Sequence, residues 1–452
     1  MKVVLARPDH HSHLIQPPLA LGYLAAYLRR EGHQVKAIDG VNLGLSIEAL
    51  VDRCAQADLV GFSILSDYYP QCVDAIKRLK ARGVKVVVGG PHVTVIPTQT
   101  LEETGADFAV TSEGEPSFAA LAANLELGGD GQDVPGVVTL DNPTPEVQPL
   151  IKDLGDLPFP DWDDMPPATY PPAPHGGVAK NYPIVPMTSS RGCPYNCSFC
   201  SSPFQWRRKI RFRPPENVVD EIAYMVSRYG VREVHFEDDN LTMKRDHAAA
   251  IAEGILSKGI KVSWATPNGI RADKVDRELL SLMQRSGLYS VAFGIESADP
   301  EVLRQCNKKA SVEKYTKAIN IASDLGIMTQ GFFIFGLPGE TPQSIQRTID
   351  FAKNSRLDKA QFLLLDVMPG TEIWDQIEPK PDLTSYQSYH DVTWCPPGVS
   401  PEVLKAAQAR AFRTFFLSKP QRIVKMIRLI KPRQWRYVMR RLLDFRIIPS
   451  RD

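Results

Sequence analysis

Cysteine is scarce in this sequence, since its 452 residues include only seven. A low and odd count argues against a secreted domain held together by disulfides and favours a reducing cytosol. Long apolar runs are missing too, because none reaches the ~18 residues that a membrane-spanning helix needs. The N-terminal segment also lacks the apolar core and cleavage site of a signal peptide. Together these absences predict a cytoplasmic protein.

An excess of charge of one sign is also missing, since 53 basic and 52 acidic residues give a net charge of +1. The balance hides an asymmetry: residues 401–452 contain fourteen Lys and Arg but only three Asp and Glu. The plain interpretation of this tail is a helical cap whose basic face balances the acidic remainder. A sharper alternative is peripheral membrane contact that serves an amphiphilic substrate. Contact with an anionic substrate is a further alternative, and we expect no nucleic-acid partner.

The N-terminal part alternates short β-branched runs with amphipathic helices over about 130 residues, which is typical of a doubly wound, Rossmann-like parallel sheet in an α/β fold. A helix is expected at 19–33, where Gly32 stops the apolar pattern. Strands are expected at 2–6, 34–39, 58–63, 84–90 and 107–112. Ligands bind beyond the carboxyl ends of such strands. The candidate binding loops are therefore Gly61–Ser63, Gly89–Thr94 and Glu113–Glu115.

A connector with nine prolines between Pro158 and Pro186 is too proline-rich for a helix or a central strand, and it predicts a linker. A second alternation follows, with strands expected at 183–190, 233–239, 261–268, 290–297, 331–339 and 362–370. Six strands are too few for a complete eightfold barrel, so an open, partial barrel is expected, with functional groups at its C-terminal strand ends. The predicted division is residues 1–135 for the first domain, 136–181 for the linker, 182–375 for the barrel and 376–452 for a helical basic region.

Three of the seven cysteines fall in the stretch RGCPYNCSFC, as Cys193, Cys197 and Cys200. Thiolates are soft ligands that suit zinc, copper(I) and iron–sulfur clusters. A structural zinc would need a fourth Cys or His nearby, and the nearest histidine is His235, in the middle of an expected strand. Three thiols can hold three irons of a [4Fe–4S] cube and leave the fourth iron open. We therefore predict these cysteines as metal ligands at the active-site end of the barrel.

The Cys-x₃-Cys-x₂-Cys spacing, with Phe199 before the last cysteine, resembles the radical S-adenosylmethionine (SAM) superfamily. The resemblance implies a [4Fe–4S] cluster whose open iron is chelated by SAM. It implies that one electron cleaves SAM to methionine and a 5′-deoxyadenosyl radical, which abstracts hydrogen from an unactivated carbon. The electron would come from a reduced flavodoxin- or ferredoxin-type donor.

Two polar elements after the second and third barrel strands support the resemblance. Glu237 and Asp238, in the stretch EDDN, resemble the element that holds the amino group of SAM. The alternative is an acidic strand end that caps the next helix. Arg271 follows the third strand, where relatives use an arginine for the SAM carboxylate. The alternative is a surface arginine that pairs with Asp273.

Two further elements follow the fourth and fifth barrel strands. Glu296 and Ser297 resemble the contacts to the ribose hydroxyls of SAM. Gly336 and Gly339, in FIFGLPGE, would let the backbone approach the adenine or the methionine end closely. Each element is weak alone, and the resemblance depends on their common order along the chain.

The N-terminal domain resembles the cobalamin-binding domain of one subclass of this family. The resemblance implies hydrogen bonds from hydroxyl groups to the nucleotide tail or corrin amides, and glycines that let the macrocycle approach the sheet edge. It places Ser63, Ser66, Gly89, Gly90, Thr94 and Glu113 at the cobalamin, and His92 and Tyr68 near its lower face. No lower ligand is assigned, because the stretch DHHSHL has Asp9 and His11 of the motif Asp-x-His-x-x-Gly but Leu14 in place of its glycine.

The resemblance implies a cobalamin-dependent methyltransferase that acts on an unactivated carbon of a small-molecule or amphiphilic substrate, by way of the deoxyadenosyl radical and methylcobalamin. One alternative is a radical SAM enzyme of another class, for oxidative cyclisation, rearrangement or 3-amino-3-carboxypropyl transfer, with the N-terminal domain empty or a scaffold. Another is a non-catalytic iron–sulfur protein that carries electrons or binds tRNA. A full set of SAM-binding elements beside an open cluster argues against the last.

Overall fold

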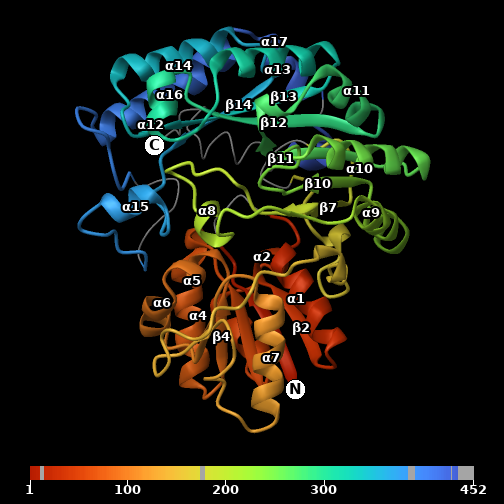
Figure 1. Cartoon of the computed structure of the whole chain (residues 1–452), viewed down its shortest axis with the longest axis vertical. Helices are drawn as coiled ribbons and strands as arrows, with labels where there is room; N and C mark the ends of the chain where they lie inside the picture. The colour runs from red at the N-terminus through yellow and green to blue at the C-terminus, as the bar shows by residue number, and fades with distance from the viewer. Residues whose placement is uncertain (11–14, 174–178, 385–391, 429, 436–452) are drawn as a thin grey trace.

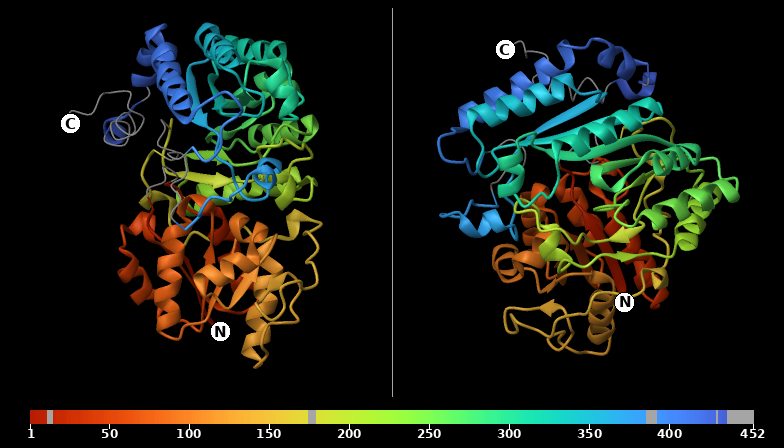
Figure 2. Two further views of the ribbon diagram at one scale, coloured as in Figure 1. Left: turned by 90° about the vertical axis from the view of Figure 1, so that its left-hand side faces the viewer. Right: turned by 45° about the horizontal axis from the view of Figure 1, so that its top comes forward.

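The computed structural model describes residues 1–10, 15–173, 179–384, 392–428 and 430–435. The expected motif residues His11 and Leu14 lie outside the described residues, as does the end of the basic tail, 436–452. Two β/α units make up the molecule. The N-terminal one, red to orange, lies against the barrel, green to cyan, in every view (Figures 1 and 2).

The N-terminal unit is built on a six-stranded sheet in the order β2-β1-β3-β4-β5-β6. The first five strands in this order are parallel and β6 is antiparallel to β5. Helices α1 and α7 share a core with Leu5 on one face, while α3 and α4 share a core with Ala6 on the other, as the alternation of a strand requires. The strands are β1 (Lys2–Arg7), β2 (Gln34–Asp39), β3 (Leu59–Ser63), β4 (Val86–Gly89), β5 (Phe108–Val110) and β6 (Val137–Val138). The helices are α1 (Leu19–Arg30), α2 (Gly40–Leu43), α3 (Ile47–Cys54), α4 (Tyr69–Ala81), α5 (Pro91–Val95), α6 (Pro97–Thr104) and α7 (Gly114–Glu126).

The second unit is an open sheet of six parallel strands in the order β14-β13-β12-β11-β10-β7, as expected for a partial barrel. Its edges are β7 and β14, which do not pair with each other. The strands are β7 (Ile184–Met187), β10 (Glu233–Phe236), β11 (Ser263–Ile270), β12 (Leu288–Glu296), β13 (Met328–Phe335) and β14 (Lys359–Leu364). The helices are α9 (Pro215–Tyr229), α10 (Arg245–Ser257), α11 (Arg277–Arg285), α12 (Pro300–Gln305), α13 (Val312–Asp324), α14 (Pro342–Asn354) and α15 (Glu372–Gln376).

A two-stranded antiparallel ribbon, which the sequence did not predict, carries the cysteine-containing loop. It pairs β8 (Ser190–Arg191) with β9 (Arg211–Phe212), and α8 (Ser202–Gln205) lies between them. The expected strand 183–190 is therefore two strands, since β7 ends at Met187 and β8 begins at Ser190. Two-residue strands are too short to show a period-2 pattern, which explains why β6, β8 and β9 were missed.

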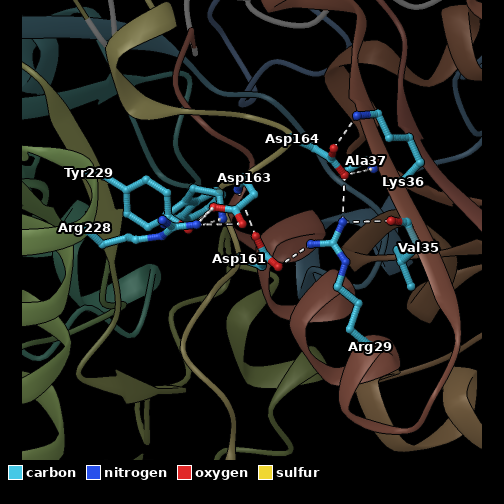
Figure 3. A network of polar contacts seen from close by, with 10 residues as sticks. Arg29, Val35, Lys36, Ala37, Asp161, Asp163, Asp164, Arg228 and Tyr229 are labelled. Carbon is cyan, nitrogen blue, oxygen red and sulfur yellow. Dashed lines mark hydrogen bonds and ion pairs between the residues drawn. The ribbon is translucent and has the colours of Figure 1, made fainter.

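The proline-rich connector is anchored to both units by its stretch DWDDM (Figure 3). Asp164 accepts hydrogen bonds from the Ala37 amide (2.9 Å) and the Arg29 guanidinium (2.8 Å), which also pairs with Asp161. On the barrel side, the Tyr229 hydroxyl donates to Asp163 (2.9 Å). Trp162 between them is fully buried. The connector is thus a structural joint and not a loose spacer.

The C-terminal region begins with α16 (Pro401–Leu417), which packs on β14 and α14, and continues with α17 (Gln421–Ile427). Both helices lie on the side of the barrel away from the N-terminal unit (Figure 2). Arg422 is buried, and its guanidinium donates to the carbonyl oxygens of Phe415 (2.6 Å), Ser355 (2.8 Å) and Leu357 (2.9 Å). Burial lowers the pKa of Arg422 to about 10.

The described part of the basic tail therefore acts at least partly as a structural cap, because Arg422 satisfies carbonyl groups after the end of α14. Within the described residues, no helix combines the length and the apolar character needed to cross a bilayer. Peripheral membrane contact by the tail stays a prediction.

Candidate functional site

The three clustered cysteines lie on the loop between β8 and α8, and all three are free and partly buried. Burial raises the pKa of Cys193 and Cys197, and it raises that of Cys200 to about 12, to which the charges of the other two thiols also contribute. The thiols are thus near neighbours that stay protonated without a cation, and a bound metal would take them as thiolates. In the described ranges no three His, Cys, Asp or Glu side chains already form a metal-binding group. The donor set nevertheless fits a [4Fe–4S] cluster in kind and number.

Backbone contacts fix the start and middle of this cysteine loop. The Gly192 amide donates to Asp239 Oδ2 (3.1 Å), and Gly192 has φ +98°. A Cβ there would overlap the carbonyl oxygen of Lys209, so only glycine fits. Further along, the Ser198 amide donates to the carbonyl oxygen of Cys306 (3.1 Å). The loop is therefore placed by the ends of β10 and α12.

The acidic residues after β10 divide into buried and cavity-facing groups. Asp238 is buried and accepts hydrogen bonds from the hydroxyl groups of Ser189 (2.8 Å) and Ser190 (2.5 Å). Burial raises its pKa to about 6. Its carboxylate is thus occupied in tying β10 to the chain after β7, and its role toward SAM stays a prediction. Glu237 and Asp239 instead line a cavity, although sequence analysis did not single out Asp239.

Arg271 lies over the cysteine loop. Its guanidinium carbon is 3.8 Å from the centroid of the Tyr195 ring. Its nitrogens donate to Asp273 (2.9 Å) and to the carbonyl oxygens of Lys308 (3.2 Å) and Lys309 (2.6 Å). The ion pair with Asp273 is thus present, as the alternative interpretation expects. Arg271 is buried, however, and not a surface residue, and it holds two loops together. Its contact with the SAM carboxylate stays a prediction.

Glu296 ends β12 with φ +62°, and its carboxylate is paired in the protein interior with Lys308 (2.8 Å). Although burial acts to lower the pKa of Lys308, the charge of Glu296 raises it above its ordinary value. The ammonium group lies 5.9 Å from the centroid of the Phe199 ring and near the Cys197 thiol. Sequence analysis missed Lys308, because a single lysine after a short helix carries no spacing signal.

Ser297, by contrast, braces the loop after β12. It is fully buried, and its hydroxyl lies 3.2 Å from that of Thr348 and accepts from the Asp299 amide (3.1 Å). To contact the ribose of SAM, the Ser297 hydroxyl would have to give up its hydrogen bonds with Thr348 and the Asp299 amide. The expected role of Ser297 stays a prediction.

The glycines after β13 shape a turn that closes over a buried carboxyl group. Gly336 and Gly339 have φ +95° and +78°, a region that L side chains disfavour. The Gly336 amide donates to Glu340 Oε2 (2.6 Å), while Glu340 Oε1 has no partner in the part of the chain that the structure describes. A Cβ at Gly339 would overlap the Gln305 side chain. Their close approach to SAM stays a prediction.

The buried Glu340 predicts a pH-dependent stability. Burial raises its pKa from 4.5 to about 8. In that range the folded protein keeps a proton that the unfolded chain has lost, so the unfolding free energy falls as pH rises, by at most about 1.4 kcal/mol per pH unit. Glu340→Gln should reduce the loss between about pH 6 and pH 8 by roughly 2 kcal/mol. Anaerobic guanidinium unfolding of both metal-free proteins measures this, and equal pH slopes would contradict it.

A cavity of about 480 Å³ lies between the two units, at the carboxyl ends of both sheets. This is within the size range of ligand sites. From the N-terminal unit it is lined by residues predicted for cobalamin, namely Ser63, Tyr68, Gly89, Gly90 and Glu113. From the barrel it is lined by Ser190, Arg191, Trp206, Glu237, Asp239 and Asn268.

Three other residues predicted for cobalamin support the turn after β4 from behind. The Ser66 hydroxyl lies 2.9 Å from His92 Nδ1. His92 is buried against the Tyr69 ring, and burial lowers its pKa to about 4. Thr94 Oγ1 donates to the Gly90 carbonyl (2.9 Å) and accepts from the Ser112 amide (3.0 Å). These contacts shape the cavity wall, and direct contact with cobalamin stays a prediction.

Comparison with known proteins agrees with this arrangement. Residues 187–352 match the family model of the Radical SAM superfamily, and residues 10–122 match that of the B12 binding domain. An uncharacterized methyltransferase of Pyrococcus horikoshii is 33% identical over 389 residues, which cover 83% of each chain. The chain belongs to the radical SAM superfamily. It carries the N-terminal B12-binding domain of the subclass that its sequence resembles.

Two other similar proteins show the range of this radical SAM subclass. An anaerobic magnesium-protoporphyrin IX monomethyl ester cyclase of Rubrivivax gelatinosus is 27% identical over 451 residues, covering 93% of this chain and 78% of the cyclase. The radical SAM methyltransferase TsrM of Kitasatospora setae, solved with cobalamin and a [4Fe–4S] cluster, has a TM-score of 0.74 at 19% identity, covering 91% and 90%. The likeness to TsrM confirms the fold. The two matched domains imply a [4Fe–4S] cluster, SAM and cobalamin as cofactors.

Proposed function

We propose that this radical SAM protein is a cobalamin-dependent methyltransferase that methylates an unactivated carbon of a small-molecule or amphiphilic substrate. The observation that carries the proposal is the cavity between the two sheets. Gly89 and Gly90 of the B12-binding domain line it from one side, and Glu237 and Asp239 of the barrel line it from the other. A ligand there would lie between the domain that binds the methyl carrier and the domain that binds SAM.

The protein's own residues would each have a limited task. The three cysteines would hold the cluster, while Arg271, Glu296 and Lys308 supply buried charges around the cysteine loop. When bound, the cluster, SAM and cobalamin would supply radical and methyl-transfer chemistry. The largely apolar lining of the cavity would help to keep water from that chemistry.

The relatives support methyl transfer and also give the second candidate. The Pyrococcus relative is named a methyltransferase, whereas the Rubrivivax relative is named a cyclase. The higher identity and the similar coverage of both chains favour the methyltransferase. Oxidative cyclisation with the same cofactors is the alternative. The electron donor is expected to be a flavodoxin or ferredoxin.

The test is an anaerobic reconstitution with iron, sulfide and hydroxocobalamin, followed by desalting and a visible spectrum. We expect retained corrin absorbance. Incubation with a low-potential reductant such as titanium(III) citrate, which takes the corrin to cob(I)alamin and reduces the cluster, and with SAM deuterated in its methyl group should then transfer deuterium to the bound corrin and, with candidate metabolites, to a product seen by mass spectrometry. A protein that cleaves SAM but retains no corrin would overturn the proposal, and one that retains corrin but oxidises a substrate without transfer of label would establish the cyclase alternative.

A further inference from the structure

Two buried glutamates and two largely buried arginines join the two domains beside the cavity, and we call them the interdomain clamp: Glu113, Glu115, Arg191 and Arg211. Arg191 donates to Glu113 Oε1 (2.8 Å) and to Glu115 Oε1 (2.7 Å), so its guanidinium bridges both carboxylates. Arg211 donates to Glu113 Oε2 (2.6 Å). The glutamates lie at the start of α7 in the B12-binding domain, and the arginines face each other across the β8–β9 ribbon of the barrel.

The clamp is almost completely shielded from water. The side chains of Glu113 and Glu115 are 1% and 8% exposed, and those of Arg191 and Arg211 are 11% and 12% exposed. The desolvation cost of such pairs offsets much of their attraction, so a buried ion pair is weak evidence for added stability. In some proteins buried ion pairs instead fix one arrangement among several, because a shifted arrangement leaves buried charges unpaired.

The position of Arg191 shows which arrangement the clamp fixes. Only Gly192 separates it from Cys193, and the Gly192 amide is itself held by Asp239. Glu113, Glu115 and Arg191 also line the cavity. The clamp therefore ties the first residues of the cysteine loop directly to the cavity wall of the B12-binding domain.

We propose that the interdomain clamp is a positioning device that sets the separation between the iron–sulfur cluster and the cobalamin. The inference rests on the proposed function and deepens it. Glu113, which sequence analysis assigned to cobalamin, then acts through Arg191 and is a positioning residue. Loss of one clamp contact should loosen the cysteine loop relative to the B12-binding domain without removing a ligand of either cofactor.

The test compares Arg191→Gln and Glu115→Gln with Arg191→Lys and with the control Arg245→Gln. Arg245 also bridges two carboxylates, of Asp276 and Glu278, but on the exposed surface of the barrel. Each protein is reconstituted, and the microwave power that saturates the EPR signal of cob(II)alamin is measured with the cluster oxidised and then reduced. A reduced, paramagnetic cluster relaxes the cobalt spin more strongly when the two are close.

We expect cluster reduction to raise the saturation power in the wild type and in Arg245→Gln. This increase should fall severalfold in Arg191→Gln and Glu115→Gln and be partly restored in Arg191→Lys, at unchanged iron and corrin content. Glu115 lies far along the chain from the cysteines. If Glu115→Gln shows the same increase in saturation power as the wild type, the inference is overturned, even if Arg191→Gln fails to bind iron. A wild-type protein without corrin would instead contradict the proposed function.

Discussion

Cys197→Ala should abolish assembly of the iron–sulfur cluster and, with it, all cleavage of SAM to 5′-deoxyadenosine. The cysteine loop supplies three thiols, and removal of one leaves two for a cube that needs at least three. Iron and sulfide content after anaerobic reconstitution measures the first effect, and deoxyadenosine formation under dithionite measures the second. Both should fall to background.

The matched control is Cys395→Ala, which removes a free and partly exposed cysteine from outside the loop. It should keep wild-type iron content and SAM cleavage. The Cys197 variant should still retain corrin, because its B12-binding domain is built on a six-stranded sheet of its own. A Cys197 variant that cleaves SAM at a wild-type rate would show that the ligand assignment is wrong.

Lys308→Met should destabilise the protein by about 3–5 kcal/mol, because it leaves the buried carboxylate of Glu296 without its partner. The double variant with Glu296→Gln should recover most of this loss, since no unpaired charge then remains. Anaerobic guanidinium unfolding of the metal-free proteins measures both. Equal loss in the single and double variants would mean that the pair contributes packing and not charge.

The same variants separate stability from SAM binding. Lys308→Met should weaken SAM binding by about 1.5–3 kcal/mol, roughly 10- to 150-fold, because we expect this ammonium, which lies near the Cys197 thiol, to make a charge-assisted contact with SAM. The stabilised double variant should not regain affinity, and the exposed neighbour variant Lys309→Met should keep it. Equilibrium dialysis with the reconstituted proteins gives the affinities. Wild-type SAM affinity in Lys308→Met would place this ammonium outside the site.

The order of the elements could be predicted from the sequence because periodicity and turn residues are local signals. The expected strands correspond to β1–β5 and to the six barrel strands, and the spacing of Cys193, Cys197 and Cys200 was enough to single them out as candidate ligands. Two-residue pairings such as β8–β9 have no such signal, since only the fold brings Arg191 opposite Arg211.

The role of single polar residues was harder to predict, because it depends on which partners the fold supplies. Asp238 and Ser297 have the expected positions at strand ends, but their polar atoms are occupied by neighbouring hydroxyl and amide groups. Lys308 had no motif to mark it, and Asp239 lay in the stretch EDDN without being singled out, so only the tertiary structure shows both beside the cysteine loop. For the basic tail, composition favoured a helical cap, but it could not single out Arg422 as the residue that ties this cap to the barrel.

The central claim is that three protein thiolates hold a cluster with one iron left for SAM, and Mössbauer spectroscopy of the reconstituted wild-type protein tests it most directly. We predict a [4Fe–4S] spectrum in which one iron site in the cube differs from the other three and changes when SAM is added. Four equivalent irons that ignore SAM, or bound zinc in place of iron, would contradict the account.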